Sequence, residues 1–135
     1  MAKIMIVEDE TLIRFALADA LIDEGHVVVE CGNVLEAVAA LGRHGDIDAV
    51  VTDIDMPGSL DGLDLVRVVR SSRPLMPIWV TSGRNADLSE FGSSVVFAAK
   101  PYDMDALARR MNALSLRASE YRRAGPFRSR LASFG

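Results

Sequence analysis

The chain has 135 residues, of which 50% are hydrophobic and 25% charged, with a formal net charge of −4. This size and balance predict one soluble globular domain, and the single cysteine, Cys31, excludes an internal disulfide. The acidic charge argues against nucleic acid as the main partner, and no apolar run reaches the roughly 20 residues that a bilayer span needs. We therefore expect a cytoplasmic protein without a signal peptide and without membrane contact.

Five short apolar runs alternate with stretches of helical period along the chain. Continuous runs of this length are typical of strands that are buried on both faces of a parallel sheet. The predicted strands are residues 4–7, 27–29, 49–51, 78–80 and 95–99. The order of elements predicts an α/β protein with a doubly wound, five-stranded parallel sheet and right-handed crossovers.

The first two helices are indicated by apolar residues at helical spacing. In the first helix, which Gly25 ends as a C-terminal cap, these residues are Leu12, Phe15, Ala16 and Ala20, with Leu17 and Leu21 beside them. In the second helix they are Leu35, Val38 and Leu41. Asn33 is the expected N-cap of the second helix, and Glu36 is its capping-box partner three residues later.

The third and fourth helices differ in how clearly the sequence pattern indicates them. A third helix through Val66 and Val69 ends before Pro74. Between Gly83 and the turn at Gly92 only residues 87–91 have a helical pattern, so the fourth helix is predicted to be weak.

The last helix leads into the end of the chain. Asp103 is its expected N-cap, and it runs through Leu107, Met111 and Leu114. The apolar period fades after about residue 118. We therefore predict one domain over residues 1–118 and a helix extension or tail over residues 119–135.

Chemically distinctive residues stand at the ends of the predicted strands. The carboxyl ends of parallel strands meet at one edge of an open sheet, where its ligand site lies. The residues at those ends are Glu8, Asp9, Asp53, Asp55, Ser82 and Lys100. Carboxylates that lie close together raise each other's pKa unless a cation compensates them, and oxygen ligands suit Mg²⁺. A carboxylate acceptor, a metal ion, a lysine and a hydroxyl are together the parts of a phosphoryl-transfer site.

These residues resemble a known signature. Glu8-Asp9, the run Asp53-Ile-Asp-Met-Pro-Gly, Ser82-Gly83 and Lys100-Pro101 are similar in order and spacing to the motifs of response-regulator receiver domains of two-component systems. The resemblance covers about residues 3–117 and implies a flavodoxin-like (βα)5 fold in a stand-alone receiver. It also implies a sensor histidine kinase or a histidine phosphotransfer protein as the donor of a phosphoryl group from phosphohistidine.

The resemblance gives roles to the residues around the acceptor. Asp53 would accept the phosphoryl group. Glu8, Asp9 and Asp53 would hold Mg²⁺, with Glu8 acting through water and with the backbone carbonyl of Asp55 as a further ligand. Lys100 would bind a phosphoryl oxygen. The protein would not be an enzyme beyond catalysing its own phosphorylation and slow dephosphorylation.

The resemblance also implies a switch. Ser82 would move to bond the new phosphoryl oxygens, and Phe97, three residues before Lys100, would turn into the space that Ser82 leaves. The Lys100-Pro101 bond is often cis in the family. The sequence departs from the family pattern in three ways. The loop after Asp53 is one residue longer, and Phe97 has no hydroxyl where many relatives have tyrosine. The segment from Ser82 to Lys100 is shorter by about one helical turn, so the resemblance predicts a shortened fourth helix.

Two other functions compete with this interpretation. Asp53-Ile-Asp55 also fits the Asp-x-Asp motif of the haloacid-dehalogenase family. There the motif normally follows the first strand, whereas here it follows the third, and the chain has no room for a cap domain. A receiver-like adaptor that works without phosphorylation is the stronger alternative. Its mark would be loss of an acidic or lysine site residue, and none is lost here.

The remaining features predict how the signal leaves the protein. The residues after Arg117 are too few for a DNA-binding domain, so we expect output through contacts with an unidentified protein target, or a role as a phosphate sink. A homodimer is compatible with both. His26 and His44 are predicted to be surface histidines, Trp79 a core residue, and the arginines of the tail a solvated face.

Overall fold

The computed structural model describes residues 1–112, so the predicted tail and Leu114 lie outside the described residues. Five parallel strands form one sheet in the order β2-β1-β3-β4-β5. The strands are β1 (Lys3–Val7), β2 (Val27–Cys31), β3 (Ala49–Asp53), β4 (Ile78–Ser82) and β5 (Val95–Ala99). This sheet confirms the predicted α/β, flavodoxin-like class, and each predicted apolar run lies within one strand.

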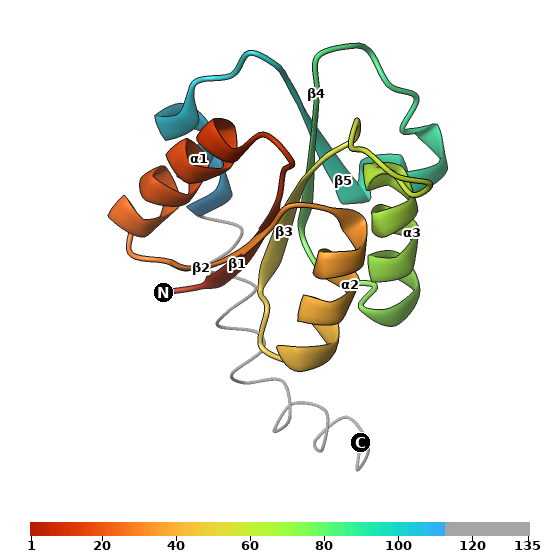
Figure 1. Ribbon diagram of the computed structural model, residues 1–135, viewed down its shortest axis with the longest axis horizontal. Helices are drawn as coiled ribbons and strands as arrows, with labels where there is room; N and C mark the ends of the chain where they lie inside the picture. Colours follow the sequence, from red (N-terminus) through yellow and green to blue (C-terminus); the bar gives the residue numbers. More distant parts are fainter. Residues whose placement is uncertain (113–135) are drawn as a thin grey trace.

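Helices cover both faces of the sheet (Figure 1). The helices are α1 (Thr11–Asp23), α2 (Val34–Arg43), α3 (Gly62–Ser72), the 3-10 helix η1 (Ser89–Ser94) and a helical segment over residues 104–112. Leu17 and Leu21 of α1 share one core cluster with Met111, while α2 and α3 pack in the other cluster. Within residues 1–112, no helix has the length and apolar character that crossing a membrane requires.

Burial along the strands explains their continuous apolar runs. Every residue of β3 and β4, which lie inside the sheet, is buried, and Trp79 is 1% exposed as predicted. β2 and β5 form the two edges and are only partly buried. β3 and β4 end in polar residues, Asp53 and Ser82, so these polar groups are held at the edge of a rigid core.

The apolar faces of the first two helices were predicted only in part. Leu12, Phe15 and Ala16 of α1 are exposed, and so are Leu35 and Val38 of α2. The buried residues are Leu17, Ala18, Ala20 and Leu21 in α1, and Val34, Ala37, Ala40 and Leu41 in α2. α1 has apolar residues all round its surface, so helical spacing fitted more than one face and could not identify the one that packs on the sheet.

Capping residues start the helices largely as predicted. Asn33 accepts a hydrogen bond from the backbone N–H of Glu36 at 2.8 Å, but the Glu36 carboxylate accepts from Gly32 instead of completing the box. A complete capping box, which was not predicted from the sequence, joins Asp61 and Asp64 at the start of α3. Asp103 accepts from the backbone N–H of residue 106 at 2.9 Å, so its predicted role as an N-cap is confirmed.

His26 is buried, and the prediction that it lies on the surface was wrong. Its side chain is 4% exposed, its Nδ1 accepts from the backbone N–H of Ala2 at 3.1 Å, and its Nε2 lies 2.8 Å from Oδ1 of Asn112. The ring therefore connects the start of β1 to the last described helical segment. These partners are 24 and 86 residues away in the chain, so no local pattern could reveal them.

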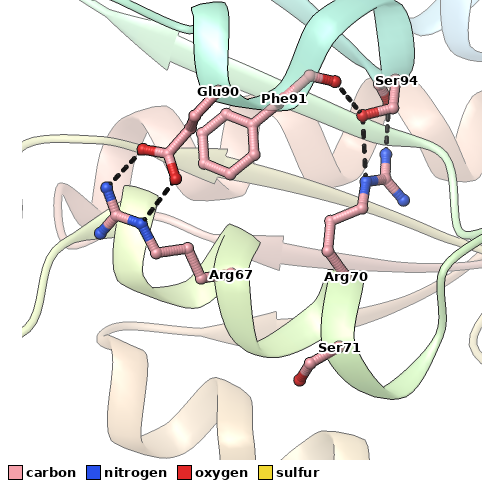
Figure 2. Close-up of a pocket in the computed structure, with 6 residues that line it drawn as sticks. All are labelled: Arg67, Arg70, Ser71, Glu90, Phe91 and Ser94. Carbon is pink, nitrogen blue, oxygen red and sulfur yellow. Dashed lines mark hydrogen bonds and ion pairs between the residues drawn. The ribbon is translucent and has the colours of Figure 1, made fainter.

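The fourth helix is short, as expected, but it is a 3-10 helix over Ser89–Ser94 with a kink at Gly92 and not a helix over residues 87–91. Two arginines of α3 hold it in place (Figure 2). Arg67 bonds both carboxylate oxygens of Glu90, at 3.0 and 2.6 Å, and its guanidinium lies 6.0 Å from the centroid of the Phe91 ring. Arg70 donates to the hydroxyl and to the backbone carbonyl of Ser94. These contacts attach η1 to α3.

Replacing Arg70 by alanine is expected to destabilise the protein by about 2 kcal/mol, because several backbone carbonyls lose their donor. Arg70 also donates to the carbonyls of Pro74 and Met76, at 3.1 and 2.6 Å, and so joins α3, the turn before β4 and the end of η1. Urea unfolding at neutral pH measures the loss. The Arg67→Ala control, whose side chain is 48% exposed, should change the midpoint less; an equal or larger change would contradict this assignment.

Candidate phosphoryl-acceptor site

Three carboxylates meet at the carboxyl ends of β1 and β3. Glu8 and Asp9 follow β1 directly, and Asp53 is the last residue of β3. One carboxylate oxygen from each of these residues lies within 4.8 Å of the others. Glu8 and Asp53 are only 3% and 4% exposed, while Asp9 is more exposed. The parallel sheet therefore brings together the acidic residues that the sequence placed at strand ends.

Lys100 reaches this cluster from the end of β5. Its Nζ lies 2.7 Å from Oε1 of Glu8 and 3.4 Å from Oδ2 of Asp53. The Lys100-Pro101 peptide bond is cis, as the sequence resemblance implied. One ammonium group thus serves two buried carboxylates, with its shorter contact to Glu8.

Burial and the neighbouring charges shift the pKa values of this group. Burial raises the pKa of Glu8 and of Asp53, and Lys100 opposes the rise at both carboxyls. Burial lowers the pKa of Lys100, but its hydrogen bond to Glu8 and the charges of both carboxylates outweigh this effect, so the net pKa is raised. The ionised carboxylates are therefore incompletely compensated, which favours a bound cation at this place.

Ser82 and Asp55 form a second group beside the acidic cluster. The Ser82 side chain is buried, and its hydroxyl donates to Oδ2 of Asp55 at 3.2 Å. The guanidinium of Arg84 donates to Oδ1 of Asp55 at 2.7 Å. This bond from Arg84 is the main reason that the pKa of Asp55 lies below its ordinary value, and the Ser82 hydroxyl also lowers it. The Asp55 side chain thus turns to the loop after β4, and it is not one of the three clustered carboxylates.

Phe97 lies on β5, outside the acidic cluster. Phe97 pairs in register with Val80 of β4. Ser82 follows Val80 by two residues, so Phe97 and Ser82 lie on the same face of the sheet. Its ring is partly buried against the cluster that contains α2 and α3. The structure therefore places the predicted switch aromatic and the predicted switch hydroxyl on one face.

Two residues near the site were not predicted from the sequence. A Cβ atom on Gly62, the first residue of α3, would lie 2.0 Å from the backbone carbonyl oxygen of Asp53, so only glycine lets α3 pack this closely. Arg84 reads as an ordinary exposed arginine in the sequence, and only the fold brings it to Asp55. An Asp-Gly pair at the start of an apolar helix was the available signal for Gly62, and Arg84 had none.

Tyr102 follows the cis peptide bond and is partly buried next to the site. Burial and the charge of Glu8 raise the pKa of Tyr102 to about 12. The phenol therefore keeps its proton at neutral pH and adds no further negative charge to the cluster.

Comparison with known proteins agrees with this geometry. Residues 4–112 match the sequence model of the response regulator receiver domain, and the chain belongs to this family. The chain is 36% identical over 119 residues to the transcriptional regulatory protein TcrA of Mycobacterium tuberculosis, and 32% identical over 123 residues to the two-component response regulator PhoP of Pseudomonas aeruginosa. These alignments cover 85% and 88% of this chain but only 46% and 54% of the two relatives, so the chain spans about half their length.

Solved structures show the same fold. The receiver domain of the hybrid histidine kinase CckA superposes with a TM-score of 0.71 at 31% identity, covering 84% of this chain and 99% of that one. A response regulator receiver protein from Sinorhizobium medicae gives 0.78 at 28% identity, covering 87% and 96%. TrrA from Thermotoga maritima, solved with Mg²⁺ and BeF, gives 0.74 at 27% identity, covering 84% and 99%.

Proposed function

We propose that the protein accepts a phosphoryl group on Asp53 from a phosphohistidine of a sensor histidine kinase or histidine phosphotransfer protein. The observation that carries the proposal is the buried Asp53 carboxylate, which lies 3.4 Å from Lys100 and within 4.8 Å of oxygens from Glu8 and Asp9. An acceptor with a fixed cation and a cluster of further carboxylates is the arrangement that phosphoryl transfer requires.

The donor set fits Mg²⁺. Three carboxylates meet at this place, and a hard divalent ion prefers such oxygen ligands. Among the described residues, Lys100 is the cation that contacts Glu8 and Asp53. Glu8, Asp9 and Asp53 would hold the ion together with the backbone carbonyl of Asp55. The ion would supply charge neutralisation for the anionic phosphoryl group during transfer.

The residues of the chain have defined parts in the proposed step. A carboxylate oxygen of Asp53 attacks phosphorus, the bond between phosphorus and the histidine nitrogen breaks, and the leaving imidazole keeps the electron pair and takes up a proton. Lys100 stabilises the phosphoryl oxygens. In slow hydrolysis water would attack phosphorus, the bond from phosphorus to the Asp53 oxygen would break, and the Asp53 carboxylate and inorganic phosphate would be returned. The chain would catalyse only these two steps on itself. Ser82 and Phe97, which share one face, would carry the change to a protein-binding surface.

The expected result of incubation with Mg²⁺ and acetyl phosphate is a mass gain of one phosphoryl group. Intact mass spectrometry measures it. Asp53→Asn and added EDTA should each abolish the gain, because one removes the acceptor and the other the metal. Asp19→Asn, an exposed aspartate of α1, is the matched control and should behave as wild type. A folded wild-type protein that gains no mass would instead support an adaptor that works without phosphorylation.

A further inference from the structure

The Ser82 hydroxyl is already engaged in this structure. Ser82 is 1% exposed, its Oγ donates to Oδ2 of Asp55 at 3.2 Å, and the same Oγ accepts from the backbone N–H of Arg84 at 3.2 Å. A serine hydroxyl has a single proton to donate. While this proton is bonded to Asp55, it cannot be donated to an oxygen of a group carried by Asp53.

Arg84 closes a ring of contacts around this hydroxyl. Its guanidinium donates to Oδ1 of Asp55 at 2.7 Å, while Oδ2 of the same carboxylate accepts from Ser82. Because both carboxylate oxygens are engaged, the plane of the carboxylate is fixed relative to β4. The ring therefore joins the loop that follows Asp53 to the loop that follows Ser82.

We propose that Arg84 is a positioning residue that holds Asp55 on the Ser82 hydroxyl and thereby opposes the phosphorylated state. The inference rests on the proposed function, because it concerns the bond that Ser82 would make to a phosphoryl group on Asp53. Loss of the Arg84 side chain leaves Asp55 free to rotate toward solvent, which its 47% exposure allows. The Ser82 proton is then available to the phosphoryl oxygens.

The direction of the effect separates this role from a simple charge effect. The Arg84 guanidinium is a cation that contacts Asp55, two residues after the acceptor, and a cation attracts a phosphoryl anion. If Arg84 acted only by charge, its removal would weaken the binding of a phosphoryl mimic. If it acts through Asp55 and Ser82, its removal strengthens that binding, and the gain depends on the Ser82 hydroxyl.

The test is calorimetric titration of beryllium fluoride, a phosphoryl mimic, into the protein with saturating Mg²⁺. Arg84→Ala is expected to bind the mimic about threefold more tightly than wild type, the scale of an exposed ion pair. In the Ser82→Ala background the same substitution should give no gain. Arg43→Ala, which removes an exposed cation at the end of α2, should match wild type.

Three outcomes would overturn the inference. Arg84→Ala could bind the mimic with unchanged or lower affinity, which fits a charge effect or no role. It could bind more tightly to the same extent without the Ser82 hydroxyl, which would remove Ser82 from the ring. Arg84→Ala could also change the free energy of unfolding by an amount that accounts for its change in affinity for the mimic, which would show that Arg84 has a structural role only. Wild-type protein that binds no beryllium fluoride would contradict the proposed function itself, a result distinct from these three.

Discussion

Gly62→Ala is expected to destabilise the protein by about 3 kcal/mol, because the added methyl group has no space. The atoms it would meet are backbone atoms: the Asp53 carbonyl oxygen at 2.0 Å, the Asp53 carbonyl carbon at 2.8 Å and the Ile54 Cα at 2.9 Å. The backbone N–H of Gly62 also donates to the Ile54 carbonyl at 3.0 Å, which fixes the start of α3 against the end of β3. Neither side of the contact can yield without moving the acceptor loop.

Urea unfolding at neutral pH measures the effect of Gly62→Ala. Gly42→Ala is the matched control, because Gly42 lies in α2 with nothing within 4 Å of an added Cβ, and alanine there should stabilise by up to about 1 kcal/mol. The variant at position 62 should also take up phosphoryl groups more slowly, since α3 and the backbone after Asp53 would shift together. A loss of stability below about 1 kcal/mol would show that the loop is softer than its contacts indicate.

The sheet and the acidic cluster could be predicted from the sequence because their signals are local. Runs such as residues 78–80 are continuous and apolar, and a parallel sheet brings the residues at the carboxyl ends of such runs to one edge. Asp53 and Lys100 lie 47 positions apart, yet each could be located from its own strand end. The topology of the sheet brings both strand ends to one edge, where Nζ of Lys100 lies 3.4 Å from Oδ2 of Asp53.

The contacts that were missed depend on tertiary packing. The position of His26 near the end of an element predicts a surface residue, whereas the fold covers it and gives both ring nitrogens a partner. Arg84 contacts Asp55 only because the fold brings the two loops together, so the sequence gives no sign of this hydrogen bond. α1 is apolar on several sides, so its period predicted the helix correctly while its buried face was decided by the sheet. The helical period and the capping residues are encoded by neighbouring residues in the sequence, whereas the choice of which apolar face of a helix is buried depends on tertiary packing.

Lys100→Met is expected to lower the free energy of unfolding at neutral pH by about 3–5 kcal/mol, the largest effect of any substitution in the acidic cluster. Methionine keeps much of the volume of the side chain but removes the ammonium that lies 2.7 Å from Glu8 and 3.4 Å from Asp53. Two buried carboxylates would then have lost their shared cation. Phosphoryl uptake should fall as well, because the phosphoryl oxygens lose the same positive charge.

The loss caused by Lys100→Met should shrink as the pH falls. The pKa values of Glu8 and Asp53 are raised in the folded protein, mainly by burial. The stability that these two groups contribute is therefore fully present below their pKa values in the unfolded chain. It is lost as the pH rises through their pKa values in the folded protein. Without Lys100 this loss becomes larger. Acidification protonates both carboxyls and removes the need for a cation, so the variant and wild type should converge in stability.

Urea unfolding at pH 7 and in mild acid, with and without Mg²⁺, measures this convergence. Lys3→Met is the matched control, because Lys3 pairs with Asp46 at 3.1 Å near the surface and should cost less than about 1 kcal/mol at either pH. Added Mg²⁺ should stabilise the variant at neutral pH by binding the folded state. If the difference between variant and wild type were the same in acid as at pH 7, Lys100 would act through packing, and the electrostatic account of the acidic cluster would be wrong.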